Sequence, residues 1–133
     1  MNNLSSQQIA LFLKRFPFRG GALRVVRIGN RSGSGTNATI IVSVLDAEAN
    51  RRVRLRLRFD GVEEYRFQRR PGAGLIKLKE VRIGWFNGLM YVNFDAWQSD
   101  EAPAVHDFRA SDAFIAGRSL SWEIVQPKAR PAT

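Results

Sequence analysis

The sequence predicts a mainly β protein, an antiparallel sandwich or a curled sheet forming a partial barrel, of about seven or eight strands with one short N-terminal helix. Several runs alternate apolar and polar residues, which is typical of strands with one buried face. Asp60-Gly61 and Asn87-Gly88 separate such runs and indicate hairpin turns. The runs follow one another without helical segments, which favours antiparallel pairing over βαβ units. With its 133 residues, the chain is expected to form one domain over residues 1–133.

Residues 4–16 predict the N-terminal helix. Ser5 and Gln8 have the spacing of a capping box, and Pro17 ends the helical pattern. One face is apolar, because its members fall at i, i+3, i+4 and i+7: Ile9, Phe12, Leu13 and Phe16. We expect this face to pack on the sheet, since so short a helix is not stable alone.

The antiparallel β core is expected to span residues 23–125. Residues 23–28 and 38–47 predict its first two strands, joined by the glycine-rich loop 29–37. The second strand has apolar residues on both faces: Ile40, Val42 and Val44 on one, Ile41 and Leu45 on the other. This pattern indicates a central strand that is partly covered on both sides.

The next strand is the segment RRVRLRLRFD, residues 51–60. Alternation points one set of side chains toward the core, namely Val53, Leu55, Leu57 and Phe59. The opposite face is expected to lie in solvent and to carry Arg52, Arg54, Arg56 and Arg58.

Asp60-Gly61 predicts a three-residue hairpin loop with Gly61 in the left-handed region, returning into VEEYRFQRR, residues 62–70. The expected cross-strand pairs are Leu55 with Tyr65, Val53 with Phe67, Arg56 with Glu64, and Arg54 with Arg66. A two-residue turn would instead oppose Leu57 to Glu64 and Leu55 to Arg66, which wastes the apolar face.

Residues 75–85 change from even to odd apolar positions, which predicts a bulge near Lys79-Glu80. Asn87-Gly88 predicts a type I′ hairpin that pairs Trp85 with Met90, Ile83 with Val92, and Val81 with Phe94. On the other face it pairs Gly84 with Tyr91, and Arg82 with Asn93. Trp85 and Trp122 are expected in the core.

The C-terminal part reads as an irregular acidic segment, then strands. Residues 97–112 predict no regular element, 113–117 a short strand and 119–125 a closing strand. Residues 126–133 are expected to form a flexible tail.

The chain is strongly basic, with a net charge of +9 and 21 Lys+Arg residues against 12 Asp+Glu. Residues 1–70 hold 14 of the basic and 5 of the acidic residues, so the whole excess lies in that half. Such asymmetry suggests an anionic partner: nucleic acid, an acidic protein surface or anionic lipid. The alternative is a solvated face in a chain whose coding sequence is GC-rich, because arginine far outnumbers lysine. The candidate binding residues are Arg52, Arg54, Arg56, Arg58 and Arg66.

Several functional classes find no support in the sequence. There are no cysteines, which excludes disulfides and thiol chemistry. We expect no signal peptide and no membrane span, and take the cytoplasm as the location. Loop 29–37 lacks the lysine and following helix of a P-loop, although its amides and Arg31 could form a small anion nest.

The acidic segment 95–112 is the remaining candidate for an enzyme or metal site. His106 and Asp107 could form a proton-transfer pair beside Ser111, and the oxygen ligands available to a metal are Asp95, Asp100, Glu101, Asp107 and Asp112. No triad, nucleophile-elbow or EF-hand spacing is present. We therefore expect no catalytic site, metal or cofactor.

Three stretches, LRLRFDGVEEYRFQ (55–68), LKEVRIGWFNGLMYVNFDA (78–96) and SLSWEIV (119–125), resemble the small bacterial immunity-protein-like β domains, nearest the immunity protein 50 family. The motif residues are packing residues: Phe59, Val62, Tyr65 and Phe67. The family's N-terminal His-Asp element has no counterpart, since the single histidine is His106. The resemblance implies a non-catalytic bacterial domain that binds and neutralises a protein partner, and it transfers no binding residue.

The expected function is therefore protein binding through the basic sheet face, with an acidic surface as partner. The first alternative is nucleic-acid binding by the same face, aided by exposed aromatic residues, for which the candidates are Tyr91, Trp97 and Phe108. The second alternative is an enzyme or metal site in segment 95–112. The oligomeric state stays open.

Overall fold

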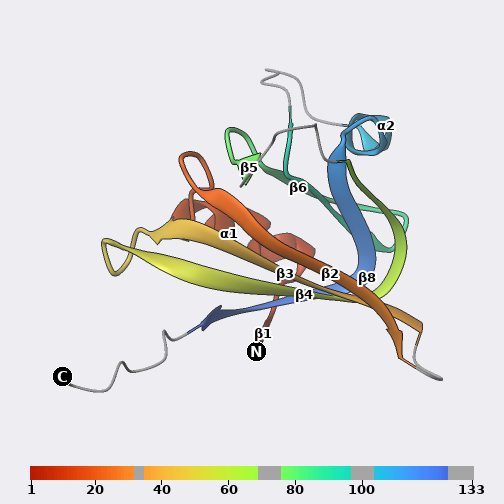
Figure 1. The fold of residues 1–133 in the computed structure, drawn as a ribbon, viewed down its shortest axis with the longest axis horizontal. Helices are drawn as coiled ribbons and strands as arrows, with labels where there is room; N and C mark the ends of the chain where they lie inside the picture. The colour runs from red at the N-terminus through yellow and green to blue at the C-terminus, as the bar shows by residue number, and fades with distance from the viewer. Residues whose placement is uncertain (32–34, 69–75, 97–103, 126–133) are drawn as a thin grey trace.

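The computed structural model describes residues 1–31, 35–68, 76–96 and 104–125. The protein is mainly β, as predicted, with a short N-terminal helix (Figure 1). In chain order the elements are β1 (Asn2–Asn3), a 3₁₀ turn (Ser6–Gln8), α1 (Ile9–Arg15), β2 (Ala22–Arg31), β3 (Gly35–Asp46), β4 (Arg51–Phe67), β5 (Ile76–Lys77), β6 (Arg82–Phe86), β7 (Leu89–Asn93), α2 (Val105–Arg109) and β8 (Ala113–Val125).

All strands belong to one antiparallel sheet in the order β5-β2-β3-β4-β8-β7-β6, with β1 paired to β8. The path starts at β5 and ends at β6, so the sheet curls without closing into a barrel (Figure 1). Of the two predicted architectures, the curled sheet is therefore confirmed. Within the described ranges, no helix is long and apolar enough to cross a membrane.

The predicted hairpin at Asp60-Gly61 is wrong. β4 runs without a turn from Arg51 to Phe67, with β3 on one side and β8 on the other. Leu55 therefore lies opposite Val42 and Ile124, and the expected pairing with Tyr65 does not form.

Gly61 nevertheless adopts the left-handed conformation that the sequence suggested, with φ of 61°. It uses this freedom in a β-bulge, because the β4–β8 register shifts between Val62 and Glu64. The buried face of β4 changes parity here: both Phe59 and Val62 contact the main core. A glycine that permits a turn also permits a bulge, and the long-range partner β8 decides between them.

The Asn87-Gly88 hairpin is confirmed, since both residues have positive φ and Trp85 pairs with Met90. The predicted bulge near Lys79-Glu80 is wrong, because the chain there divides into β5, paired with β2, and β6, paired with β7. The two predicted strands after residue 112 form a single β8, and the segment expected to be irregular contains α2.

Two apolar clusters lie on opposite faces of the sheet. The main core lies under α1, where the buried rings of Phe12 and Phe16 contact Trp122. Ser5 N–H donates to Gln8 Oε1 at 3.1 Å, as the capping-box pattern predicted. The smaller cluster lies under α2 and consists of Leu89, Tyr91, Phe108, Phe114 and Ala116.

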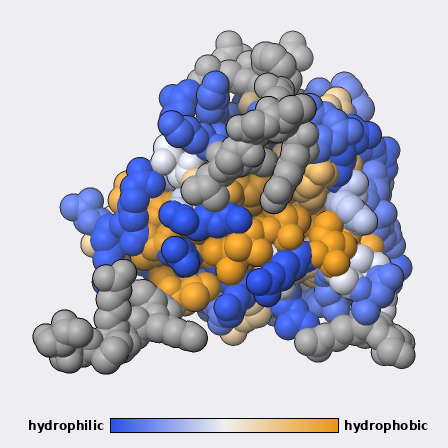
Figure 2. All heavy atoms as spheres, in the orientation of Figure 1, coloured by the Kyte–Doolittle hydropathy of each residue, from blue (hydrophilic) through white to orange (hydrophobic). Residues whose placement is uncertain are grey.

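The two tryptophans that were expected in the core differ in how far they are buried. Trp122 is half-buried against α1, but Trp85 is 45% exposed on the edge strand β6, so its prediction was wrong. Figure 2 shows an apolar area in the middle of the face turned to the viewer, framed by hydrophilic side chains.

Candidate arginine-rich binding face

The arginine row of β4 faces outward, as the alternation predicted. Leu55, Leu57 and Phe59 are at most 1% exposed and belong to the main core. Arg54, which precedes them, is exposed, and the side chains of Arg56 and Arg58, which alternate with them, are each 39% exposed. The opposite side of this half of the sheet carries α1 (Figure 1).

Neighbouring strands extend this basic surface. On β3, Ile41 lies opposite Arg56 and Leu45 lies opposite Arg52. On β2, Arg27 lies opposite Thr39, and Arg24 lies in a bulge where its Nε donates to Ser43 Oγ. We call this surface the arginine face; its members are Arg24, Val25, Arg27, Ile41, Leu45, Arg52, Arg54, Arg56 and Arg58.

The six arginines of this face differ in how far the protein itself satisfies them. Arg56 Nη1 lies 2.5 Å from Glu123 Oε1, and Arg58 Nε lies 3.4 Å from Asp60 Oδ1. Arg52 Nη1 donates to the Gly20 carbonyl oxygen at 3.2 Å. Within the described residues, Arg27 and Arg54 make no ion pair. These two are therefore the cations most available to a partner.

Arg66, the fifth predicted binding residue, lies beyond the bulge and outside this face. It donates to the carbonyl oxygens of Arg109, at 2.9 Å, and Ser111, at 3.4 Å. Its guanidinium also lies 5.9 Å from the centre of the Phe114 ring. These contacts attach the end of α2 to the sheet, which is a structural role.

A polar cluster under α2 was missed by the sequence reasoning. Tyr91 donates its hydroxyl to Glu64 Oε2, and Arg109 donates to both Glu64 oxygens at 2.7 and 3.0 Å. Arg109 lowers the pKa of Glu64 by hydrogen bonding, while burial first and Glu64 second raise the pKa of Tyr91. No sequence signal pointed here, because the three residues come from β4, β7 and α2.

The aromatic residues expected to be exposed for nucleic-acid stacking are not available for it. Tyr91 and Phe108 are at most 1% exposed, because Phe108 of α2 packs on Tyr91 within the smaller cluster. Trp97 lies outside the described residues. The arginine face as described contains no aromatic side chain.

The acidic segment assembles no catalytic or metal geometry among the residues that the structure describes. His106 Nε2 lies 3.3 Å from Asp107 Oδ1, but the two side chains are 80% and 52% exposed. Ser111 is buried, and its Oγ accepts the N–H of Ala113. The described ranges hold no group of three or more potential metal ligands. Asp100 and Glu101, like the predicted tail 126–133, lie outside them.

Most of the predicted glycine-rich loop 29–37 is strand, since β2 extends to Arg31 and β3 begins at Gly35. The Ser-Gly-Ser centre of the predicted anion nest, residues 32–34, lies outside the described residues.

The fold and this surface define an open-sheet β protein with a basic, partly aliphatic outer face. Comparison of the chain with protein-family models, curated proteins and solved structures found no match.

Proposed function

We propose that the protein is a non-catalytic binding protein whose arginine face binds an acidic protein surface. The observation that carries this proposal is the combination, on one half of the sheet, of free cations with outward aliphatic side chains, of which Leu45 is exposed and Ile41 half-buried. Ile41 and Leu45 of β3 lie between the arginines of β2 and those of β4. Arginine is favoured at protein interfaces, where its apolar stem adds contact area to its charge.

The same composition favours protein over nucleic acid as the partner. Single-stranded nucleic acid is bound by aromatic platforms, which the described part of this face lacks. Two of its six arginines already have carboxylate partners, Glu123 and Asp60, which reduces the charge available for phosphates. Aliphatic side chains such as Leu45, 37% exposed, contribute to a protein interface but bring little to a phosphate backbone.

The resemblance to immunity-protein-like domains would add that the partner is neutralised. The comparisons give that family no support, so the proposal depends on the surface alone and concerns binding.

The test is a paired charge reversal. The variant Arg27→Glu/Arg54→Glu changes two exposed side chains that face away from the core, so we expect it to fold. The control Lys14→Glu/Lys79→Glu changes the net charge equally at exposed sites outside the arginine face, Lys14 on α1 across the sheet and Lys79 after β5. The readout is stoichiometric capture of one protein from the cell of origin, followed by titration with that purified protein.

We expect the arginine variant to lose binding by at least about a hundredfold, as for charged residues in an interface centre, and the lysine variant to bind as wild type. Equal loss in both variants would show a net-charge effect and refute the proposal. Binding to a labelled oligonucleotide with a steep linear fall of log affinity against log salt would instead support the nucleic-acid alternative.

A further inference from the structure

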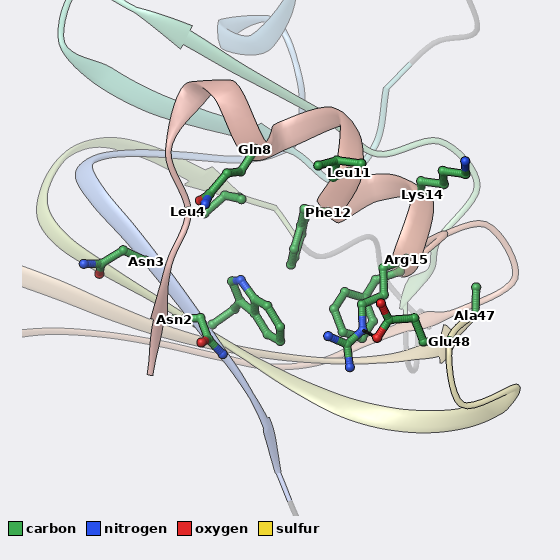
Figure 3. Close-up of a pocket in the computed structure, with 12 residues that line it drawn as sticks. Asn2, Asn3, Leu4, Gln8, Leu11, Phe12, Lys14, Arg15, Ala47 and Glu48 are labelled. Atoms are coloured by element: carbon green, nitrogen blue, oxygen red, sulfur yellow. Dashed lines mark ion pairs between the residues drawn. The ribbon is translucent and has the colours of Figure 1, made fainter.

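A second surface feature lies on the other side of the sheet, at α1. A groove with a volume of about 640 Å³ lies between β1, α1 and the β3–β4 turn. Figure 3 shows Phe12 and Leu11 along α1, Asn2 and Asn3 at one end, and Arg15 with Glu48 at the other. Trp122 and Phe16 complete the aromatic wall.

The groove joins an apolar body to a cationic end. Leu4, Phe12 and Phe16 are buried, whereas Leu11 at the margin is 71% exposed. The volume falls within the range typical of small-molecule sites, about 300–1,000 Å³, which are mostly apolar with a few placed polar groups.

Arg15 is the most firmly placed of these polar groups. Its guanidinium carbon lies 4.8 Å from the centre of the Phe16 ring and 5.5 Å from that of Trp122. Asp46, 3% exposed, accepts hydrogen bonds from Arg15 Nε and Nη2, at 3.2 and 3.3 Å. Asp46 therefore fixes the guanidinium from behind, and Nη1 makes no hydrogen bond within the described residues.

Glu48 differs from Asp46 because it contacts the same guanidinium from the solvent side. Its Oε2 lies 3.1 Å from Arg15 Nε, and its side chain is 69% exposed. A carboxylate already at the groove end, held by one contact, marks where the carboxylate of a ligand would go.

We propose that the groove binds a small amphipathic carboxylate. Its apolar body packs on Phe12 and Trp122, and its carboxylate accepts hydrogen bonds from Arg15 with Lys14 nearby, displacing Glu48. Charge complementarity argues for this occupant: the residues that line the described groove include two cations, Lys14 and Arg15, against one acidic residue, Glu48. The site is separate from the arginine face, which lies on the opposite side of the sheet.

The probe is hydrocinnamate, titrated by calorimetry into the whole chain, with the uncharged hydrocinnamamide as matched ligand. We expect hydrocinnamate to bind saturably and the amide to bind at least about tenfold more weakly, the difference expected for a hydrogen bond to a charged group.

Variants locate the site. Glu48→Gln removes the competing carboxylate and should tighten hydrocinnamate binding about threefold or more, whereas Glu63→Gln, an equal change at a distant exposed site, should leave it unchanged. Leu11→Asp places a negative charge at the exposed margin and should weaken binding, with circular dichroism confirming the fold.

Three results would overturn the proposal: no saturable binding at millimolar ligand, equal binding of acid and amide, or equal effects of the Glu48 and Glu63 changes. Sedimentation showing a dimer that Leu11→Asp dissociates would also overturn it, because a second copy of the chain would then cover the groove.

Discussion

Replacing Glu64 with glutamine tests whether the polar cluster holds α2 on the sheet. Tyr91 is fully buried and donates its hydroxyl to the ionised Glu64, so the change leaves this hydroxyl a neutral acceptor. Hydrogen bonds to charged groups contribute about 1.5–3 kcal/mol and neutral ones about 0.5–1.5, so the free energy of unfolding should fall by about 1 kcal/mol. The lost contact with Arg109 adds to this fall, at a reduced magnitude because Arg109 is exposed and the contact is screened.

Urea unfolding, followed by far-UV circular dichroism, measures this loss. With a slope of about 1–3 kcal/mol per molar urea, the midpoint should fall by about 0.3–1 M. Glu63→Gln is the matched control, because Glu63 is the adjacent residue and pairs with Arg118 at an exposed site. If the two variants lose equal stability, the cluster contributes nothing specific and the reasoning is refuted.

The contact between Glu64 and Arg109 predicts that stability depends on pH. Because hydrogen bonding from Arg109 lowers the pKa of Glu64 in the folded state, its stabilisation is complete above the unfolded pKa of about 4.3 and is lost as the pH falls through the lower folded value. Wild type should therefore lose more stability than Glu64→Gln below about pH 4, as acid titration in fixed urea would measure. An identical acid dependence in both proteins would contradict this linkage.

Three further changes test the packing. Gly61→Ala should cost about 1–2 kcal/mol in urea unfolding, because Gly61 has φ of 61°, whereas Gly29→Ala, with open space around its Cβ, should cost nothing. Phe108→Ala should cost about 3–5 kcal/mol by the same measurement and alter near-UV circular dichroism, because the ring is buried among aromatic neighbours; a loss below about 1 kcal/mol would show that α2 does not depend on it. Asp46→Asn should lower the free energy of unfolding at neutral pH and make it fall less steeply below about pH 4, because Arg15 lowers the pKa of Asp46 in the folded state. An unchanged loss of stability in acid would show that the pair of Arg15 and Asp46 does not cause it.

Local patterns in the sequence were sufficient for part of this fold. The Asn87-Gly88 hairpin and its register were predictable, since two positive-φ residues fix both turn and pairing. The outward arginines of β4 were predictable too, because period-two alternation needs no knowledge of the partner strands.

Long-range partners account for what could not be predicted. At Gly61 the same backbone freedom serves a turn or a bulge, and only β8, more than fifty residues later, selects the bulge. Similarly, Tyr91 looked exposed because its strand alternates, but α2 covers that face. The polar cluster and the groove at α1 are missed for the same reason, since each combines residues from separate elements.

The outward residues of β8 differ between the half of the sheet under α2 and the half that forms the arginine face. Under α2 they are Phe114 and Ala116, and on the arginine face they become Ser121 and Glu123. A purely solvated face accounts for Glu123 and the arginines but gives no role to Leu45, which is 37% exposed.

Leu45→Ser therefore separates the two interpretations of this face. Since the side chain lies outside the core, stability should change by less than about 0.5 kcal/mol in urea unfolding. A protein partner should bind the variant about tenfold or more weakly, because a lost interface aliphatic costs about 1–2 kcal/mol. Leu11→Ser, an exposed leucine on the groove side, should bind that partner as wild type. Unchanged binding by Leu45→Ser together with loss in Arg27→Glu/Arg54→Glu would mean that charge alone is recognised, which is the behaviour of a phosphate-binding surface rather than a protein interface.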